Sequence, residues 1–118
     1  MDERRAFGNR GEDLAVAFCL SHGYRIVDRN WSCRMGEIDL IAEQNGVTHF
    51  IEVKTRRTTE FGNPEESITS TKLQHLRRAI EMYLRMAKSP PVQYQADALA
   101  ITMREGKPPE VHFIEGIL

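Results

Sequence analysis

The chain has 118 residues, 41% of them hydrophobic and 28% charged, which is typical of one globular domain with a single modest core. No apolar run reaches the roughly 20 residues that a membrane-spanning helix needs, so we expect no membrane contact. The two cysteines lack a Cys-x-x-Cys pair, which excludes a disulfide framework and a zinc site of the usual spacing. We therefore expect a single domain over residues 1–118, with reduced thiols in the cytoplasm.

The net charge of −1 argues against a protein that coats DNA through its overall charge, because such proteins are basic. The charge is unevenly distributed along the chain. Residues 54–88 carry 8 basic and 4 acidic side chains, whereas residues 1–53 and 89–118 each have a negative balance. The middle third is thus the segment best suited to face phosphates, although a solvated helix face would give the same pattern.

A first helix is predicted from about Arg10 to Ser21. Asn9 is a favourable N-cap, and Glu12 follows three residues later, which is the spacing of a capping box. Gly23 can supply the left-handed conformation that ends a helix. The apolar residues Leu14, Ala15, Phe18 and Cys19 recur at helical intervals and are expected to face the core.

Three strands are predicted next, over Tyr24–Trp31, Gly36–Glu43 and Val47–Thr55. Asn45 and Gly46 lie between the second and third strands, and Asn-Gly is a strong signal for a two-residue hairpin turn. These two strands are therefore expected to be adjacent and antiparallel.

After a polar loop, a second helix is predicted over Thr71–Ala87, followed by strands over Val92–Met103 and Val111–Leu118. The apolar face of this helix is formed by Leu73, Leu76, Ile80, Tyr83 and Leu84. The order α-β-β-β-α-β-β predicts an α/β fold in which helices flank a mixed sheet.

The Asn-Gly turn fixes the register of the predicted hairpin. With a two-residue turn, Asp39 is opposite Glu52, and Glu37 is opposite Lys54. Because side chains alternate between faces, one face carries Glu37, Asp39, Ile41, Phe50, Glu52 and Lys54. The other face, expected to be the core, carries Ile38, Leu40, Ala42, Ile51 and Val53.

Two carboxylates in directly opposed positions destabilise a sheet, so the Asp39–Glu52 pair suggests a function. A divalent cation between them would remove the repulsion, and hard oxygen ligands suit Mg²⁺ or Mn²⁺. Two other interpretations remain open: solvent screens both carboxylates, or Glu37 and Lys54 form a simple cross-strand ion pair. Glu12 likewise has two possible roles, as a capping-box residue or as a third acid of the site.

The segments Gly36-Glu37-Ile38-Asp39-Leu40-Ile41 and Ile51-Glu52-Val53-Lys54-Thr55-Arg56 resemble the Asp…Glu-x-Lys signature of the PD-(D/E)XK nuclease superfamily, which has the restriction-endonuclease-like fold. More closely, the chain resembles the YraN family of bacterial proteins, which is related to the archaeal Holliday junction resolvases. The resemblance extends from about Phe7 to Ile101. It includes Gly8, Gly11, Glu12, Ala15, Gly23, Tyr24, Asn30, Phe61, Gly62, Pro64, Lys72, Ala79, Tyr83 and Leu84.

This resemblance implies that Asp39, Glu52 and the backbone carbonyl of Val53 bind Mg²⁺ or Mn²⁺. It also implies that Lys54 orients water or stabilises charge in the transition state, and that Glu12 is an additional catalytic acid. Phosphate contacts are expected from Arg56, Arg57, Lys72, Arg77 and Arg78. The chain has Gln95-Ala96-Asp97 where family members usually have Arg-Phe-Asp, which puts contacts made by that strand in doubt.

The leading hypothesis is therefore a divalent-metal-dependent endonuclease that hydrolyses phosphodiester bonds in DNA, including branched or otherwise non-standard DNA. The alternative is a module of the same fold that binds nucleic acid without cutting it, or that cuts only with a partner. A degraded nuclease would be expected to lose Asp39, Glu52 or Lys54, and all three are present. Because enzymes that cut branched DNA usually combine two active sites, a homodimer is a further expectation.

Overall fold

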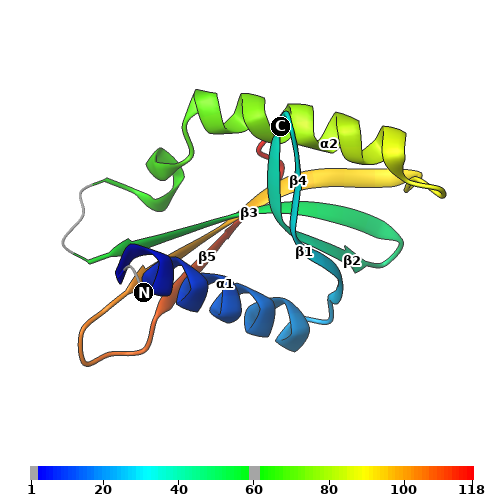
Figure 1. Cartoon of the computed structure of the whole chain (residues 1–118). Helices are drawn as coiled ribbons and strands as arrows, with labels where there is room; N and C mark the ends of the chain where they lie inside the picture. Colours follow the sequence, from blue (N-terminus) through cyan, green and yellow to red (C-terminus); the bar gives the residue numbers. More distant parts are fainter. Residues whose placement is uncertain (1–2, 59–61) are drawn as a thin grey trace.

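Figure 1 shows the computed structural model of the chain, which describes residues 3–58 and 62–118. Phe61, one of the residues on which the resemblance rests, lies outside the described residues. The elements are α1 (Glu3–Ser21), β1 (Arg25–Cys33), β2 (Gly36–Gln44), β3 (Val47–Arg57), the short 3₁₀ helix η1 (Pro64–Ser67), α2 (Ser70–Met86), β4 (Gln93–Met103) and β5 (Glu110–Ile114).

The five strands form one mixed sheet in the order β1-β2-β3-β4-β5. Only the central pair, β3 and β4, is parallel, because α2 forms the crossover between these two strands. The other neighbours are antiparallel. In Figure 1, α2 covers one face of the sheet and α1 covers the other. The predicted α/β class and the order α-β-β-β-α-β-β are therefore confirmed.

Both faces of the sheet are buried, although only one was expected to be a core. On the α1 side, the buried cluster contains Ala15, Cys19, Leu40, Ala42, Ile51, Leu99 and Ile101. On the α2 side, it contains Ile38, Ile41, Phe50, Leu76, Ala79, Ile80 and Ala96. The second cluster arises because the amphipathic face of α2 also requires an apolar partner. No helix in the described part of the chain is long and apolar enough to cross a membrane.

Two predicted boundaries are wrong by more than two residues, the start of α1 and the end of β5. α1 begins at Glu3 instead of Arg10, so Asn9 lies inside the helix and does not cap it. Residues 3–7 contain good helix formers and no proline, so the helix extends through them. At the other end of the chain, β5 ends at Ile114, because Gly116 has a φ of 67° that interrupts the extended conformation.

The predicted hairpin register is confirmed next to the turn, and the two predicted pairs Asp39–Glu52 and Glu37–Lys54 are not part of the ladder. Residues 40–44 of β2 pair with residues 47–51 of β3, in the predicted register. Asn45 and Gly46 form the turn with φ values of 53° and 77°, as a type I′ turn requires. The turn therefore sets the positions of both strands that carry the predicted acidic residues.

The ladder ends one residue before Asp39 and Glu52 would form a pair. The backbone N–H of Val53, which a continued ladder would place opposite Ile38, instead donates to Asp39 Oδ2 at 2.8 Å. As β2 diverges, Ile38 packs with the α2 side of the core. Its predicted location on the same face as Leu40 is therefore wrong.

Two glycines allow the helices to approach the sheet closely at this divergence. Gly11 of α1 packs so tightly on β3 that a Cβ atom would overlap the hydroxyl of Thr55. At the start of β2, a Cβ atom on Gly36 would lie 2.8 Å from the backbone oxygen of His75 in α2. The first of these contacts brings the neighbouring residue, Glu12, against the strands.

We predict that Gly11→Ala destabilises the protein by about 1–3 kcal/mol, because the added methyl group forces α1 away from Thr55. Gly8→Ala is the matched control, since Gly8 lies in the same helix with no atom within 4 Å of an added Cβ. Removing a helical glycine there should stabilise the fold by about 0.5–1 kcal/mol. Urea unfolding measures both changes, and equal effects of the two substitutions would contradict this packing role.

Candidate active site

A polar hollow of about 770 Å³ lies between the N-terminal half of α1, the diverging ends of β2 and β3, and the first turn of α2. All four predicted catalytic side chains line it: Glu12 from α1, Asp39 from β2, and Glu52 and Lys54 from β3. Glu12 is free to do so because α1 starts early, which removes the capping-box alternative. The fold thus brings these four residues together, and their chemical roles stay predictions.

Asp39 is the most perturbed acid of the hollow. Burial, followed by the neighbouring carboxylate of Glu52, raises the pKa of Asp39 to about 7, with smaller contributions from Glu12 and Glu37. The hydrogen bond from the Val53 N–H acts in the opposite direction and partly stabilises the charged form. The repulsion inferred from the sequence is therefore present, even though Asp39 and Glu52 are not partners in the ladder.

The side chain of Lys72, in the first turn of α2, neutralises part of this negative charge. Its Nζ lies 3.1 Å from Glu52 Oε1, and the Glu52 side chain is only 13% exposed. The alternative cross-strand pair, Glu37 with Lys54, does not form among the described residues, although both side chains line the hollow. Sequence spacing alone could not reveal the Glu52–Lys72 contact, because it depends on how α2 packs on the sheet.

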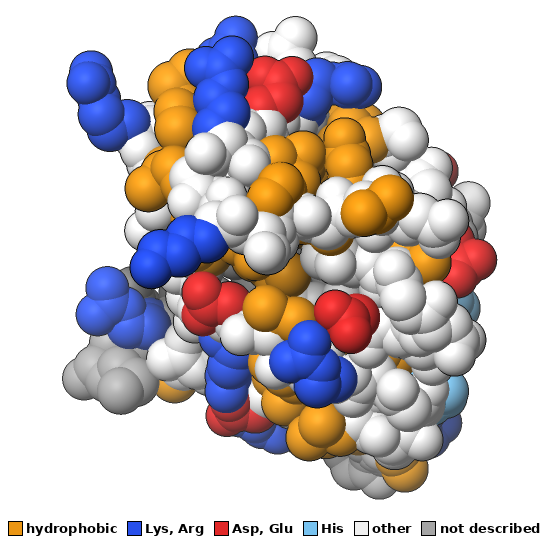
Figure 2. Space-filling model, turned by 90° about the vertical axis from the view of Figure 1, so that its right-hand side faces the viewer, with side chains coloured by type: hydrophobic (Ala, Val, Ile, Leu, Met, Phe, Trp, Pro, Cys, Tyr) orange, Lys and Arg blue, Asp and Glu red, His pale blue; other side chains and the backbone are white. Residues whose placement is uncertain are grey.

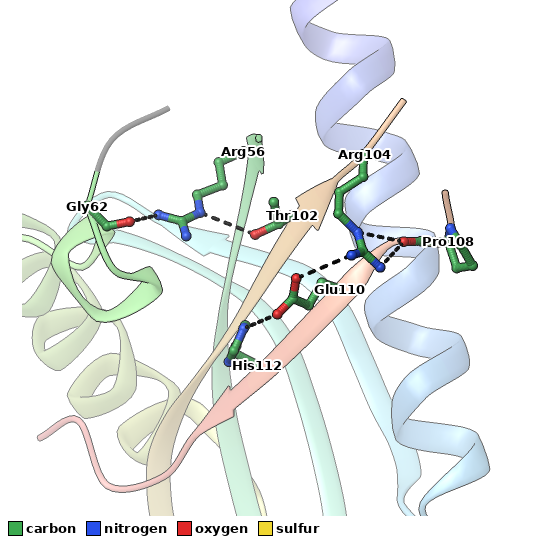
Figure 3. Close-up of polar contacts among 7 residues, drawn as sticks. All are labelled: Arg56, Gly62, Thr102, Arg104, Pro108, Glu110 and His112. Carbon is green, nitrogen blue, oxygen red and sulfur yellow. Dashed lines mark hydrogen bonds and ion pairs between the residues drawn. The ribbon is translucent and has the colours of Figure 1, made fainter. Parts of the chain in front are cut away.

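The arginines predicted to contact phosphates have different surroundings. Arg57 lines the hollow and is exposed. Arg56 is engaged within the protein: its Nε donates to Thr102 Oγ1 at 3.2 Å and its Nη1 donates to the carbonyl of Gly62 at 2.7 Å, as Figure 3 shows. These contacts make Arg56 a bridge between β3, β4 and the loop that follows β3. Arg57 is therefore the more accessible cation.

Arg77 and Arg78 are exposed on α2 but do not line the hollow. Arg77 instead borders a separate depression with Tyr94 and Leu118. Figure 2 shows basic side chains gathered at the top of one face, at the level of α2 in Figure 1, with hydrophobic side chains among them. Of the five predicted phosphate contacts, the fold therefore brings Arg57 and Lys72 next to the catalytic candidates.

The donor atoms of the hollow are compatible with Mg²⁺ or Mn²⁺. Within residues 3–58 and 62–118, no group of three His, Cys, Asp or Glu side chains forms a cage for a metal ion. The candidates are two carboxylates, those of Asp39 and Glu52, with the carbonyl of Val53. Mg²⁺ commonly binds through one or two carboxylates while keeping several waters, whereas a structural zinc site requires four protein ligands.

Comparison with known proteins identifies the relatives of this chain. Residues 11–101 match the Uncharacterised protein family UPF0102. The chain belongs to this family. It is 42% identical to the UPF0102 protein of Caldicellulosiruptor saccharolyticus over 100 residues, 85% of each chain. It is 39% identical to that of Leifsonia xyli over the full length of both chains, and 40% identical to that of Nocardia farcinica over 98% of this chain and 91% of the relative. The matched region includes all four predicted catalytic residues, Glu12, Asp39, Glu52 and Lys54.

In this UPF0102 protein, Asp97 lies outside the hollow and has a structural role. Its side chain is fully buried, hydrogen-bonds to His49 Nδ1, and accepts from Gln95 Nε2 at 2.7 Å and from the Gly116 N–H at 3.0 Å. Asp97 thereby joins β3, β4 and the C-terminal tail. Burial, with a contribution from Asp97, raises the pKa of Cys19 to about 11, which keeps this thiol protonated at neutral pH. Because Gln95, Ala96 and Asp97 do not line the hollow, the departure at Gln95-Ala96 does not alter its walls.

We predict that Asp39→Asn stabilises the metal-free protein at alkaline pH. The unfolded pKa is about 3.9 and the folded pKa is about 7, so the folded state binds more protons between these values, and stability falls as pH rises through this window. At pH 8 the substitution should raise the free energy of unfolding by up to about 4 kcal/mol. Below pH 4 it should have little effect.

Urea unfolding in the presence of EDTA, repeated across this pH range, measures the effect. Asp13→Asn is the control, because Asp13 is an exposed residue of α1 whose pairing with Arg29 contributes little. An Asp39→Asn protein with the stability and pH dependence of the unmodified protein would show that Asp39 is not held in a repulsive environment.

Proposed function

We propose that this UPF0102 protein is a divalent-metal-dependent endonuclease of the PD-(D/E)XK superfamily, acting on DNA. The observation that supports this most is the convergence of Asp39, Glu52 and Lys54 in one hollow, from strands that diverge at that point. The signature residues, which come from two different strands, thus line the same space.

Each residue of the hollow has a distinct task in the proposed reaction. Asp39 and Glu52, with the Val53 carbonyl, would hold Mg²⁺ or Mn²⁺, which when bound polarises the phosphate and lowers the pKa of water. The N–H of Val53 fixes the Asp39 carboxylate in its orientation by donating to Oδ2. The ammonium group of Lys54 would donate hydrogen bonds to the attacking water or to a phosphate oxygen, where negative charge increases during the reaction.

Lys72 and Arg57 would contribute to substrate binding at the edges of the same hollow. In the metal-free protein, Lys72 reduces the charge on Glu52 through the ion pair at 3.1 Å. A cation bound at Glu52 would compete for that carboxylate and leave Lys72 available for a phosphate. Glu12 would be the third acid, able to accept a hydrogen bond from water in the hollow. The homodimer stays a prediction.

The second candidate is a nucleic-acid-binding module without catalytic activity. The observation that favours it is the Glu52–Lys72 ion pair, which already satisfies one of the two carboxylates without a metal. This candidate does not explain why Asp39 is buried beside a second acid, because binding DNA requires no repulsive pair. The endonuclease therefore accounts for more of the site.

The proposed activity is tested with linear, flapped and four-way-branched DNA in the presence of Mn²⁺ or Mg²⁺. We expect the unmodified protein to cut at least one of these substrates, and Glu52→Gln and Lys54→Ala each to reduce the rate by at least about 100-fold. Glu43→Gln and Lys88→Ala are the matched controls, since both residues are exposed or partly exposed away from the hollow. They should cut at the unmodified rate.

Two results would contradict the proposal. The first is cleavage that persists at full rate in both site variants, which would indicate a contaminating nuclease or a different site. The second is DNA binding by the unmodified protein without cleavage in either metal, which would favour the binding module.

A further inference from the structure

A second groove, of about 1040 Å³, lies beside the proposed catalytic hollow. It runs between the N-terminal half of α1 and the turn that connects β4 to β5. Glu3, Phe7 and Arg57 line both spaces, so the groove and the hollow are adjacent. An extended molecule bound at the hollow would reach the groove by passing these three residues.

The charge of the groove differs from that of the hollow. The groove has four cations, Arg10, Arg57, Arg104 and Lys107, against two acids, Glu3 and Glu105. The hollow has more acids than cations, and carboxylates are suited to bind a metal ion. A polyanion centred on a cation in the hollow would therefore find complementary charge along the groove.

The walls of the groove also offer apolar and planar surfaces. The guanidinium of Arg57 lies 4.4 Å from the ring centre of Phe7, at the junction with the hollow. Met103, Pro108 and Pro109 line the far side. Nucleobases stack on aromatic rings and on the guanidinium plane of arginine, whereas a paired duplex keeps the faces of its bases inside its own stack. An unpaired strand can therefore use both the cations and these surfaces, whereas a paired duplex can use only the cations.

The wall formed by the β4–β5 turn is held in place by internal contacts. Figure 3 shows the Arg104 side chain directed at the turn, where Nε and Nη2 donate to the Pro108 carbonyl at 3.1 and 2.9 Å. Arg104 also lies 3.8 Å from Glu110, which in turn hydrogen-bonds to His112. Lys107, by contrast, is exposed at the turn and is available to a ligand.

We propose that this groove binds a single-stranded segment of DNA that continues from the phosphodiester in the catalytic hollow. Phosphates of this segment contact Arg10 and Lys107, and one base stacks at the Arg57–Phe7 pair. This inference rests on the proposed nuclease function and narrows its substrate class to DNA with an unpaired strand next to the cleavage site.

The test measures binding of a fluorescent oligothymidylate by anisotropy in EDTA, where no metal-dependent cleavage occurs. The double variant Arg10→Glu/Lys107→Glu is compared with Arg85→Glu/Lys88→Glu. The control reverses an arginine in the last turn of α2 and a lysine just after this helix, neither of which lines the groove. We expect the groove variant to bind at least about tenfold more weakly. Its plot of log K against log salt should be shallower by about 1 to 2, because two phosphate contacts are lost.

Each outcome is decisive. Equal weakening in the two double variants, or tighter binding of a blunt duplex than of the single strand, overturns the groove proposal. If groove variants lose binding but the unmodified protein cuts no DNA in Mn²⁺ or Mg²⁺, the groove proposal stands as a binding site and the nuclease function fails. If the protein cuts DNA and the groove variant binds normally, only the groove proposal fails.

Discussion

The rest of this structure holds together two partly buried carboxylates that repel each other. Asp39 and Glu52 are held near each other at the point where β2 separates from β3, and burial together with this proximity raises the pKa of Asp39 to about 7. Such an arrangement lowers the stability of the metal-free fold near neutral pH. It persists because the Asn45-Gly46 turn and the two buried faces of the sheet fix both strands in place.

The close packing of the helices places one further acid and one cation beside this acidic pair. Gly11 lets α1 approach Thr55, which brings Glu12 to the hollow, and Gly36 lets α2 approach β2. The first turn of α2 then supplies Lys72 to Glu52. The resulting surface has an acidic centre suited to a divalent cation and a basic groove beside it. A DNA strand cut at this site would need the same two features, a cation at the reacting phosphate and positive charge along the rest of its backbone.

Much of this could be predicted from the sequence, because the deciding signals were local. The Asn-Gly turn fixed the hairpin register, and helical periodicity identified the buried face of α2. The predicted start of α1 is wrong because Asn9 and Glu12 have the spacing of a capping box, although residues 3–7 are also good helix formers. The divergence of β2 and the location of Ile38 could not be predicted, because both depend on how distant elements pack. The Glu52–Lys72 pair and the contact of Arg56 with Thr102 are long-range contacts of the same kind. The positions set by the hairpin turn and by helical periodicity were therefore predicted correctly, and the contacts set by tertiary packing were not.

The central claim is that the hollow holds a divalent cation between Asp39 and Glu52. The most direct measurement is anomalous X-ray diffraction from crystals soaked in MnCl₂. We predict an anomalous peak bounded by these two carboxylates and the Val53 carbonyl, with Lys72 no longer within ion-pair distance of Glu52. No peak at this position in crystals that show Mn²⁺ elsewhere, with the Glu52–Lys72 pair intact, would contradict the account.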